Sequence, residues 1–327
     1  MRRRKFLGIL TGAAAAVPLA ARAQVSKERP LIGWLGGSSA TASSALVRAF
    51  LKGLQEIGYI EGRNFDIVYR FANGDLGQLP TLADDLVRAK TDVILAFAVS
   101  GAVAARKVTS KIPIVTPALA DAVHLGLIAN DARPGGNVTG LAPYLDGLPG
   151  KQLELAREIV PQALVVGLLD DTSDVKSAPQ RQEIESIGPK IGVKIVSAEV
   201  KQLNDIDSAF QALAAQRVQV VIVLQSSMFF GARQRIATAA AVNRLPTTYG
   251  YREHVEAGGL VSYGVDLRFC AYRSATFVDK ILKGANPGDL PVEFPTKLEL
   301  VINLSTAKSL GLTIPESFLL RADEVIE

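Results

Sequence analysis

The side chains that most often carry catalysis are scarce in this 327-residue chain. Its two histidines, His124 and His254, are far apart in the sequence and do not have the spacing of metal ligands. The single cysteine, Cys270, falls in a stretch of helical periodicity with no neighbouring base to activate it. Asp170 and Asp171 are the only acid and base that we can assign, and neighbours at one strand end rarely converge on one substrate atom. The sequence therefore predicts a protein that is not an enzyme and holds no metal.

A nucleotide cofactor is not indicated either. The segment 33–37 follows the first apolar strand-like run and resembles part of a dinucleotide-binding loop. It does not match G-x-G-x-x-G, however, and no acidic residue ends the second predicted strand, as that fingerprint requires. We therefore expect no cofactor.

Small, hydroxylic and acidic loops follow the predicted strands, at the ends where open parallel sheets place their ligand sites. Ser100 and Gly101 begin a predicted helix whose first backbone N–H groups would attract a carboxylate. Ser38 and Ser39 stand in the same position before the helix that starts near residue 42. Each serine could instead serve only as a helix cap. Asp121 could pair with a ligand ammonium group, or could make a local turn.

Aromatic residues form only 6% of the chain, yet several fall at or beside the same strand ends. A large ring with a polar tip can line a pocket and still reach a hydrogen-bond partner. Phe229 and Phe230 begin a predicted helix, and at least one of them is expected to face the core. The residues that we expect to bind a ligand are Trp34, Ser38, Ser39, Ser100, Gly101, Asp121, Asp171, Ser226, Tyr249, Tyr251 and Tyr263.

The elements that must position these loops follow an alternating pattern from residue 30 onward. Runs rich in β-branched residues alternate with segments of helical period, which predicts parallel sheets covered by helices on both faces. About 300 residues are enough for two such lobes. Strands are predicted at 31–35, 65–71, 92–97, 112–116, 138–141, 164–169, 194–198, 218–224, 247–249 and 260–263. Helices are predicted near 42–57, 78–89, 101–108, 151–159, 178–189, 205–216 and 229–243.

The boundaries between the lobes are predicted from breaks in this pattern. Pro143, Gly147, Pro149 and Gly150 interrupt both periodicities. We expect an N-terminal lobe of residues 30–142 plus about 265–297, and a C-terminal lobe of residues 150–263 plus about 304–327. The hinge crossings are expected at 143–149, at 264 and at 298–303.

The first 23 residues have the form of a cleaved export signal. Residues 2–5 are basic, a short apolar run follows, and Ala21-Arg22-Ala23 is typical of a cleavage site. Arg3-Arg4 also has the twin-arginine form, although a Sec signal can carry paired arginines. No cysteine stands at the cleavage point to carry a lipid, and no later segment is long and apolar enough for a membrane helix. We therefore expect a soluble periplasmic protein.

Removal of this signal changes the apparent charge of the protein. The whole chain carries +4, but five basic residues leave with the signal, so that 31 basic residues face 32 acidic ones and the net charge becomes −1. A nucleic-acid partner would need clustered Lys and Arg on the mature domain. We expect none.

Four segments carry a resemblance to a known family: 133–140 (RPGGNVTG), 258–264 (GGLVSYG), 295–304 (PTKLELVINL) and 310–315 (LGLTIP). They resemble the periplasmic substrate-binding proteins of ABC transporters, in the group that includes binders of tryptophan and related aromatic amino acids. The resemblance covers essentially the whole mature chain. It implies a type I binding-protein fold with a ligand between two lobes and delivery to a membrane permease.

The resemblance also implies site residues. It places Ser100 and Gly101 at the ligand from the first lobe, with Asp121 in the next loop, and it implicates the loop 249–252 and Tyr263 from the second. The chain departs from the family where it has Asp121-Ala-Val in place of Asp-Pro-Val, and Asp170-Asp171 in place of Asn-Pro.

The function expected from the sequence is capture of a small molecule, an amino acid or similar, by a monomeric protein that closes over it. Two alternatives stay open. The protein could report a bound ligand to a membrane receptor, or it could be an exported enzyme that uses the same cleft.

Overall fold

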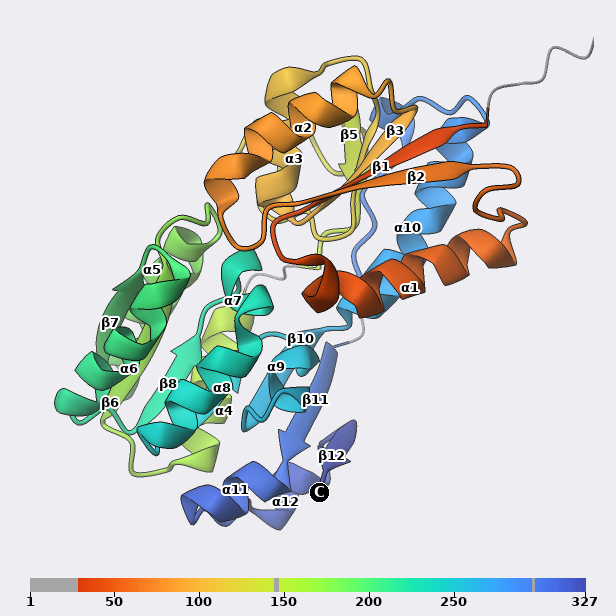
Figure 1. Ribbon diagram of the computed structural model, residues 1–327. Coiled ribbons are helices and arrows are strands. Elements are labelled where there is room, and N and C mark those ends of the chain that lie inside the picture. The colour runs from red at the N-terminus through yellow and green to blue at the C-terminus, as the bar shows by residue number, and fades with distance from the viewer. Residues whose placement is uncertain (1–28, 144–146, 296–297) are drawn as a thin grey trace, which may run out of the picture.

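The computed structural model describes residues 29–143, 147–295 and 298–327, and it consists of two lobes, each built around a β-sheet (Figure 1). The first sheet is wholly parallel, in the order β2-β1-β3-β4-β5. Its strands are β1 (Leu31–Gly36), β2 (Asp66–Phe71), β3 (Val93–Phe97), β4 (Ile114–Thr116) and β5 (Val138–Gly140).

Helices cover both faces of this first sheet. On one face lie α1 (Ala40–Glu56) and α10 (Leu267–Leu282), which pack against each other, and on the other lie α2 (Leu79–Arg88) and α3 (Val99–Val108). A short 3₁₀ helix, η1 (Leu76–Gln78), precedes α2, and another, η4 (Pro287–Asp289), follows α10. The strands are therefore buried on both sides, as their apolar sequences require.

The second sheet has the order β12-β11-β10-β9-β8-β6-β7 and is parallel except where β10 meets β11. Its strands are β6 (Val165–Asp171), β7 (Lys194–Val200), β8 (Val220–Val223), β9 (Thr247–Tyr249), β10 (Val261–Val265), β11 (Leu298–Asn303) and β12 (Glu324–Ile326). The interior strand β8 is a run of four fully buried aliphatic residues. Such a run is typical of a strand with helices on both of its faces.

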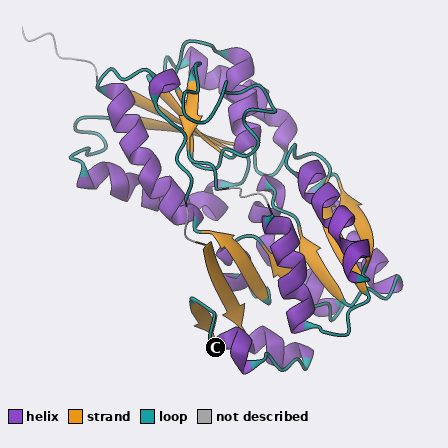
Figure 2. Ribbon diagram, turned by 180° about the vertical axis from the view of Figure 1, so that it is seen from behind, coloured by secondary structure: helices purple, strands orange, loops and turns teal. Residues whose placement is uncertain are grey.

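Helices lie on both faces of the second sheet, as Figures 1 and 2 show from opposite sides. One face carries α4 (Leu148–Ile159), α5 (Ser177–Ile187), α11 (Leu304–Leu310) and α12 (Glu316–Leu319), with η2 (Gly188–Ile191). The other carries α6 (Ile206–Ala215), α8 (Arg233–Val242) and α9 (Arg252–Glu256), with η3 (Leu203–Asp205). The short helix α7 (Ser227–Gly231) stands just beyond the carboxyl end of β8. The predicted α/β fold with two doubly wound lobes is confirmed.

The chain passes between the lobes three times: between β5 and α4, between β10 and α10, and between η4 and β11. Two details differ from the sequence predictions. Residues 298–303, expected as a crossing, form β11, because this apolar run pairs with β10 and is buried in the second sheet. Gly264, also expected as a crossing, lies inside β10, and the chain turns toward the first lobe only after Val265.

The helix predicted at 229–243 is divided into α7 and α8, which meet at Ala232. The export signal predicted at 1–23 lies outside the described residues. Within the described ranges, no helix combines the length and the apolar character that crossing a bilayer requires.

Candidate ligand-binding site

A pocket lies between the two lobes and encloses about 400 Å³ of space not filled by atoms, part of it open to solvent. Both lobes contribute to its lining. The lining residues are Gly36, Gly37, Ser38, Ser43, Leu46, Phe97, Ala98, Ala118 and Leu267 from the first lobe, and Lys176, Ser226, Ser227, Phe230 and Tyr251 from the second.

The fold explains why these residues meet. In both sheets the parallel strands end toward the gap between the lobes, and the segments that follow β1, β3, β4, β6, β8 and β9 all reach the pocket. The carboxyl ends of parallel strands are the usual place for a ligand in such folds. The pocket therefore lies at the strand ends at which the sequence analysis expected a ligand.

The pocket has apolar walls. The rings of Phe97, Phe230 and Tyr251 line it together with Leu46 and Leu267. Phe230 and Tyr251 belong to the same buried apolar cluster as Leu46 and Leu267, although they come from the other lobe. Their two rings meet edge to face, with centroids 6.2 Å apart. The walls thus suit a ligand with a flat apolar body.

The polar side chains that line the pocket are hydroxyls, which can donate or accept, and one ammonium. Ser38 is 5% exposed, and its Oγ has no hydrogen-bond partner within the described structure. Ser226 caps α7 by accepting a hydrogen bond from the Phe229 backbone N–H, at 3.0 Å. The hydroxyl of Tyr251 donates to Oε1 of Gln225, at 3.0 Å. Lys176 is the one charged side chain among the described residues that line this pocket.

Two buried carboxylates stand behind Lys176. Its Nζ lies 3.7 Å from Oδ2 of Asp174, a side chain with no exposed surface. Asp174 also accepts hydrogen bonds from the backbone N–H groups of Lys176 and Ser227. Burial lowers the pKa of the Lys176 ammonium, but the carboxylates of Asp174 and Asp171 and the Tyr251 hydroxyl raise it by more, so that its pKa lies above the ordinary value. Lys176 is therefore a protonated, fixed donor.

Asp171 does not reach the pocket, although it was predicted to bind a ligand. It ends β6, fully buried, and its Oδ1 accepts hydrogen bonds from the backbone N–H and the hydroxyl of Ser173, at 3.0 and 2.5 Å. Burial raises the pKa of this carboxyl, and the nearby Asp174 raises it further, whereas hydrogen bonds from Ser173 and Ser226 lower it. Its role here is to hold the loop that carries Lys176.

The first turns of α1 and α3 in the first lobe differ in whether a side chain caps them. Ser39 caps α1, because its Oγ accepts a hydrogen bond from the Ala42 backbone N–H at 3.2 Å, so it does not face the pocket freely. Helix α3 begins at Val99, earlier than predicted, with no side-chain cap. Its N-cap is Ala98, at φ 72° and ψ 160°. A residue with a Cβ rarely adopts this conformation, and such strain gathers at ligand sites.

The other two residues expected at this helix start lie inside α3. Ser100 does not line the pocket, and its buried Oγ has no hydrogen-bond partner in the described structure. Gly101 packs toward the sheet, since a Cβ built on it would lie 3.5 Å from Ala96 and 3.6 Å from the carbonyl oxygen of Leu35. It holds α3 close to the strands rather than touching the pocket.

Three of the four predicted aromatic residues lie away from the pocket. Trp34 is fully buried in the first lobe, stacked on Phe97 at 5.7 Å. Tyr249 is buried in the second lobe and stacks on His254 at 4.7 Å. Tyr263 packs against the buried cluster beneath α4. Each lies within a strand, so its side chain points to a face of the sheet, and of the four only Tyr251, beyond the end of β9, lines the pocket.

Asp121 lies in a smaller hollow beside the pocket. It has a positive φ of 50°, and it shares this hollow with Leu125 of its own lobe and with Lys176 and Pro179 of the other. Lys176 therefore lines both spaces, whereas Asp121 lines only the smaller one.

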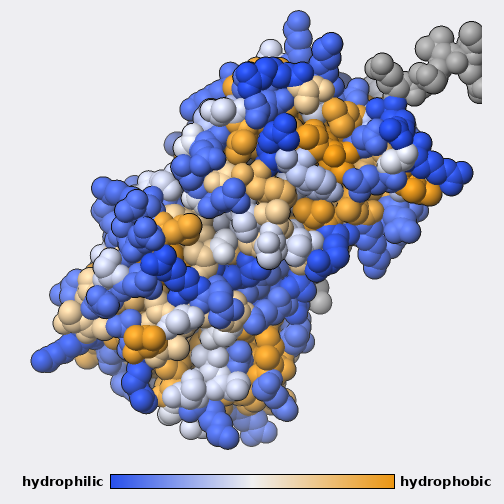
Figure 3. Space-filling view, viewed as in Figure 1, coloured by the Kyte–Doolittle hydropathy of each residue, from blue (hydrophilic) through white to orange (hydrophobic). Residues whose placement is uncertain are grey.

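The lobes touch each other around the pocket, and Figure 3 shows side chains meeting across the waist of the molecule. A Cβ built on Gly37 would lie 2.8 Å from the Cβ of Ser227, and one built on Gly231 would lie 2.8 Å from Oγ of Ser38. Contacts this short leave room only for glycine. The guanidinium of Arg233 also donates to the carbonyl oxygen of Ala42, at 3.4 Å.

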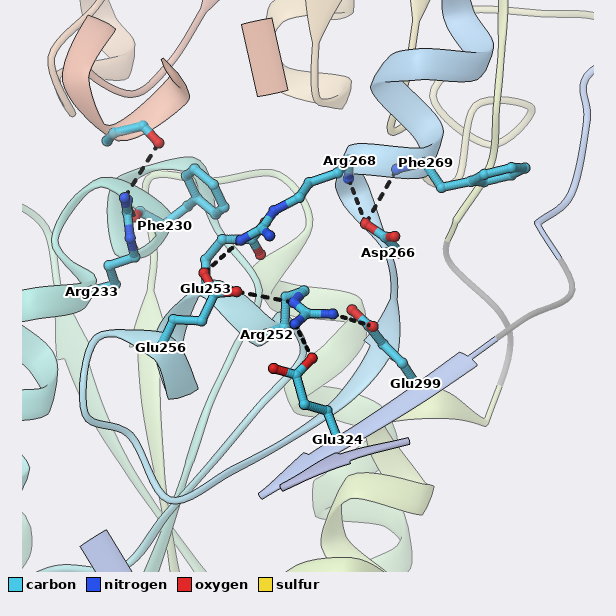
Figure 4. Close-up of polar contacts among 11 residues, drawn as sticks. Phe230, Arg233, Arg252, Glu253, Glu256, Asp266, Arg268, Phe269, Glu299 and Glu324 are labelled. Carbon is cyan, nitrogen blue, oxygen red and sulfur yellow. Dashed lines mark hydrogen bonds and ion pairs between the residues drawn. The ribbon is translucent and has the colours of Figure 1, made fainter. Parts of the chain in front are cut away.

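An ionic cluster lies where the chain passes from β10 to α10 (Figure 4). Asp266 caps α10 by accepting from the backbone N–H groups of Arg268 and Phe269, at 2.8 and 3.2 Å. The guanidinium of Arg268 then reaches α9 of the other lobe, at 3.3 Å from Glu253 and 2.5 Å from Glu256. Burial raises the pKa of Glu253, and Arg268 partly offsets this effect.

A second arginine extends this cluster within the second lobe. Arg252 forms ion pairs with Glu256 at 3.1 Å, with Glu299 at 2.9 Å and with Glu324. These contacts tie α9 to β11 and β12. The sequence analysis did not identify this cluster, because its members come from four separate elements.

Several pocket residues were missed by sequence reasoning. Phe97 was placed only at the end of a predicted strand, Leu267 was given no role, and at least one of Phe229 and Phe230 was expected to face the core. Lys176 follows β6 by a few residues, and a lysine in a loop is ordinarily solvent-exposed. The available signal was its proximity to the acidic loop 170–174, which was examined only for its carboxylates.

Comparison with known proteins identifies the family that this chain matches. Residues 39–326 match the family described as ABC transporter substrate binding protein. A curated relative, the Tyrosine-binding protein of Clostridioides difficile (strain R20291), is 28% identical over 265 residues, which cover 81% of this chain and 76% of the relative.

Two solved structures are similar over 91% of this chain. An ABC domain from Streptococcus pneumonia, in complex with L-Trp, is 26% identical with a TM-score of 0.84, and all of it is covered. The ligand-free, open structure of a substrate binding protein with adhesive properties from Clostridium difficile is also 26% identical, with a TM-score of 0.64 and 99% covered. At equal identity, the lobes are thus arranged more as in the ligand-bound relative. Together with the fold and the interlobe pocket, these matches show that this chain belongs to the ABC transporter substrate binding proteins.

Proposed function

We propose that this protein captures an aromatic amino acid, or a close analogue, in the interlobe pocket and delivers it to an ABC permease. The observation that carries this proposal is the composition of the pocket. Aromatic rings from both lobes line it, and hydroxyl and ammonium groups stand beyond the carboxyl ends of the strands. A flat apolar body would lie between Phe97, Phe230 and Tyr251. The complex of a relative with L-Trp and the name of the curated relative support the same ligand class.

Capture proceeds by closure of the two lobes. A ligand that touches both lobes only when they are closed shifts the population toward the closed form. Support comes from the close approach of Gly37 to Ser227 and of Gly231 to Ser38 across the gap between the lobes. The better superposition on the L-Trp complex than on the open relative points the same way.

The place of action follows from the sequence and the family. Residues 1–23 have the form of an export signal, and ABC substrate binding proteins hand their solutes to a permease. We therefore propose that the mature chain acts in the periplasm. Of the residues predicted from sequence, Ser38, Ser226 and Tyr251 are the ones that we assign to ligand contact, since they line the pocket.

The experiment is a thermal melt of the mature chain with L-tryptophan, L-tyrosine, L-phenylalanine and L-leucine, followed by small-angle scattering with the best stabiliser. At a concentration 100 times Kd, a ligand adds about 2.7 kcal/mol to the free energy of unfolding. We expect an aromatic amino acid to raise Tm by several degrees and to reduce the radius of gyration. Absence of any stabilisation and of any compaction across an extended amino-acid panel would overturn the proposal.

A further inference from the structure

The pocket carries positive charge without a facing negative charge. Lys176 is the one charged side chain in its described lining, and neither Asp121 nor Asp171 lines it. The Lys176 side chain is 9% exposed, and its nearest carboxylate oxygen, on Asp174, is 3.7 Å away, which is longer than a hydrogen bond. The ammonium is therefore free to donate to a ligand in the pocket.

The opposite wall offers hydroxyl groups, which can donate to an anion, and its described lining contains no acidic side chain. Ser38 of the first lobe is nine-tenths buried and has an Oγ without a partner in the described structure. It stands directly before α1, a helix of 17 residues whose first turn contains no acidic residue. Helix α3 reaches the pocket through Ala98, with no side chain to cap its first N–H groups. An uncapped helix start such as that of α3 favours an anion.

The acidic residues of the second lobe do not change this balance. The two carboxylate oxygens of Asp174 accept hydrogen bonds from the backbone N–H groups of Lys176 and Ser227. Asp171 lies deeper and accepts a hydrogen bond from Ser173. Their charge holds Lys176 in place and keeps it protonated. A ligand that carries an ammonium but no carboxylate would instead face the ammonium of Lys176 and be repelled.

We propose that Lys176 is a specificity-determining residue that binds a carboxylate of the ligand, so that the carboxylate is required for binding and an α-ammonium group is not. The inference rests on the proposed function and narrows its ligand class to aromatic compounds that carry a carboxylate. Because Lys176 belongs to the second lobe and Ser38 to the first, one carboxylate between them links charge recognition to lobe closure. An aromatic amine without a carboxylate gains neither contact.

Three matched ligands test this: L-tyrosine, 3-(4-hydroxyphenyl)propanoate, which lacks the ammonium, and tyramine, which lacks the carboxylate. Calorimetric titration of the mature protein should give similar Kd values for the first two, within about tenfold. Loss of a charged hydrogen bond and exposure to like charge should weaken tyramine by roughly 100-fold or more. The inference would be overturned if tyramine bound as tightly as tyrosine, or if the Kd of the propanoate were 100-fold higher than that of tyrosine.

The variant Lys176→Met keeps most of the length of the side chain and removes its charge. Its Kd for tyrosine and for the propanoate should rise by about 10- to 100-fold, and its preference for tyrosine over tyramine should fall toward one. Lys190→Met is the matched control, since Lys190 is exposed on η2 and should leave both values unchanged. Lys176→Arg should keep the preference, because it keeps the charge. An undiminished preference in Lys176→Met would overturn the inference.

Failure of this inference and failure of the proposed function give different results. If another amino acid proves to be the ligand, its own deaminated and decarboxylated analogues replace the three compounds. If no amino acid binds, the proposed function fails. If amino acids bind but the decarboxylated analogue binds equally well, only the assignment of Lys176 fails. Should Lys176→Met not fold, the comparison of the three ligands on the unaltered protein still decides.

Discussion

Gly37→Ala should weaken ligand binding by blocking closure of the lobes. The added Cβ would lie 2.8 Å from the Cβ of Ser227, where an ordinary contact needs 3.4 to 4 Å. It would also lie 2.8 Å from Cδ2 of Leu76, but that atom ends a flexible side chain of the same lobe and can move in open and closed forms alike. Gly37 does not have a positive φ, so its backbone accepts alanine. The strain therefore falls on the closed form.

The size of the effect follows from this overlap. Overpacking of a tight contact costs about 1–3 kcal/mol. Because a ligand must supply this energy to reach the closed form, its Kd should rise by about 5- to 150-fold. Calorimetric titration with L-tryptophan measures the change in Kd, and small-angle scattering at saturating ligand measures the loss of compaction.

A rescue variant separates blocked closure from a direct clash with the ligand. Ser227→Gly removes the opposing Cβ, so Gly37→Ala combined with Ser227→Gly should regain most of the affinity. Gly77→Ala is the matched control, because a Cβ there approaches only Asp75 of its own lobe, at 3.1 Å. Wild-type affinity in Gly37→Ala, or no recovery in the double variant, would refute the reasoning.

Three further predictions concern charge. The pKa of buried His254 is lowered by burial and by Arg233 from 6.5 to about 3, so the unfolded chain takes up a proton that the folded chain does not, and stability should fall by about 2 kcal/mol between pH 7 and pH 5. In His254→Asn, the free energy of unfolding measured in urea should lose this contribution to its fall between pH 7 and pH 5. An unchanged pH dependence would contradict this origin. Arg268→Ala should lower the free energy of unfolding by about 1–3 kcal/mol, because it leaves the buried carboxylate of Glu253 without its partner while the guanidinium itself is one-third exposed. Adding Glu253→Gln should recover most of that loss, and failure to do so would show that the ion pair is not the cause. Asp121→Ala should change the Kd for L-tyrosine by less than about threefold, because Asp121 lies outside the pocket lining, and a tenfold loss would place it at the ligand.

The sequence predicted the elements well where the pattern is local. The four aliphatic residues of β8 could only be a strand buried on both faces, and the helix near 42–57 needed no more than its periodicity and Ser39. Pairing partners were harder. The apolar run 298–303 looked like a link between lobes, because periodicity does not show that it pairs with β10.

The pocket was predicted in place but only partly in content. Tyr251 and Trp34 look alike in sequence, since both are large rings near strand ends. Trp34 lies two residues before the end of β1 and enters the core, whereas Tyr251 lies two residues beyond the end of β9 and reaches the gap. Lys176 was missed because it lies at the boundary between the lobes, where it borders both hollows, and no local pattern reveals that placement.

Distance measurement between the lobes tests the central claim most directly. Spin labels at Thr81→Cys on α2 and Lys201→Cys after β7 would stand on exposed positions of opposite lobes, and Cys270 is fully buried and would stay unlabelled. Nearby, Gly74 and Leu203 bring the two lobes into contact, so this separation reports opening at that edge. With saturating L-tryptophan, pulsed electron paramagnetic resonance should show one short, narrow distance, and without ligand a longer, broader distribution. The same distribution with and without a bound ligand would contradict capture by closure.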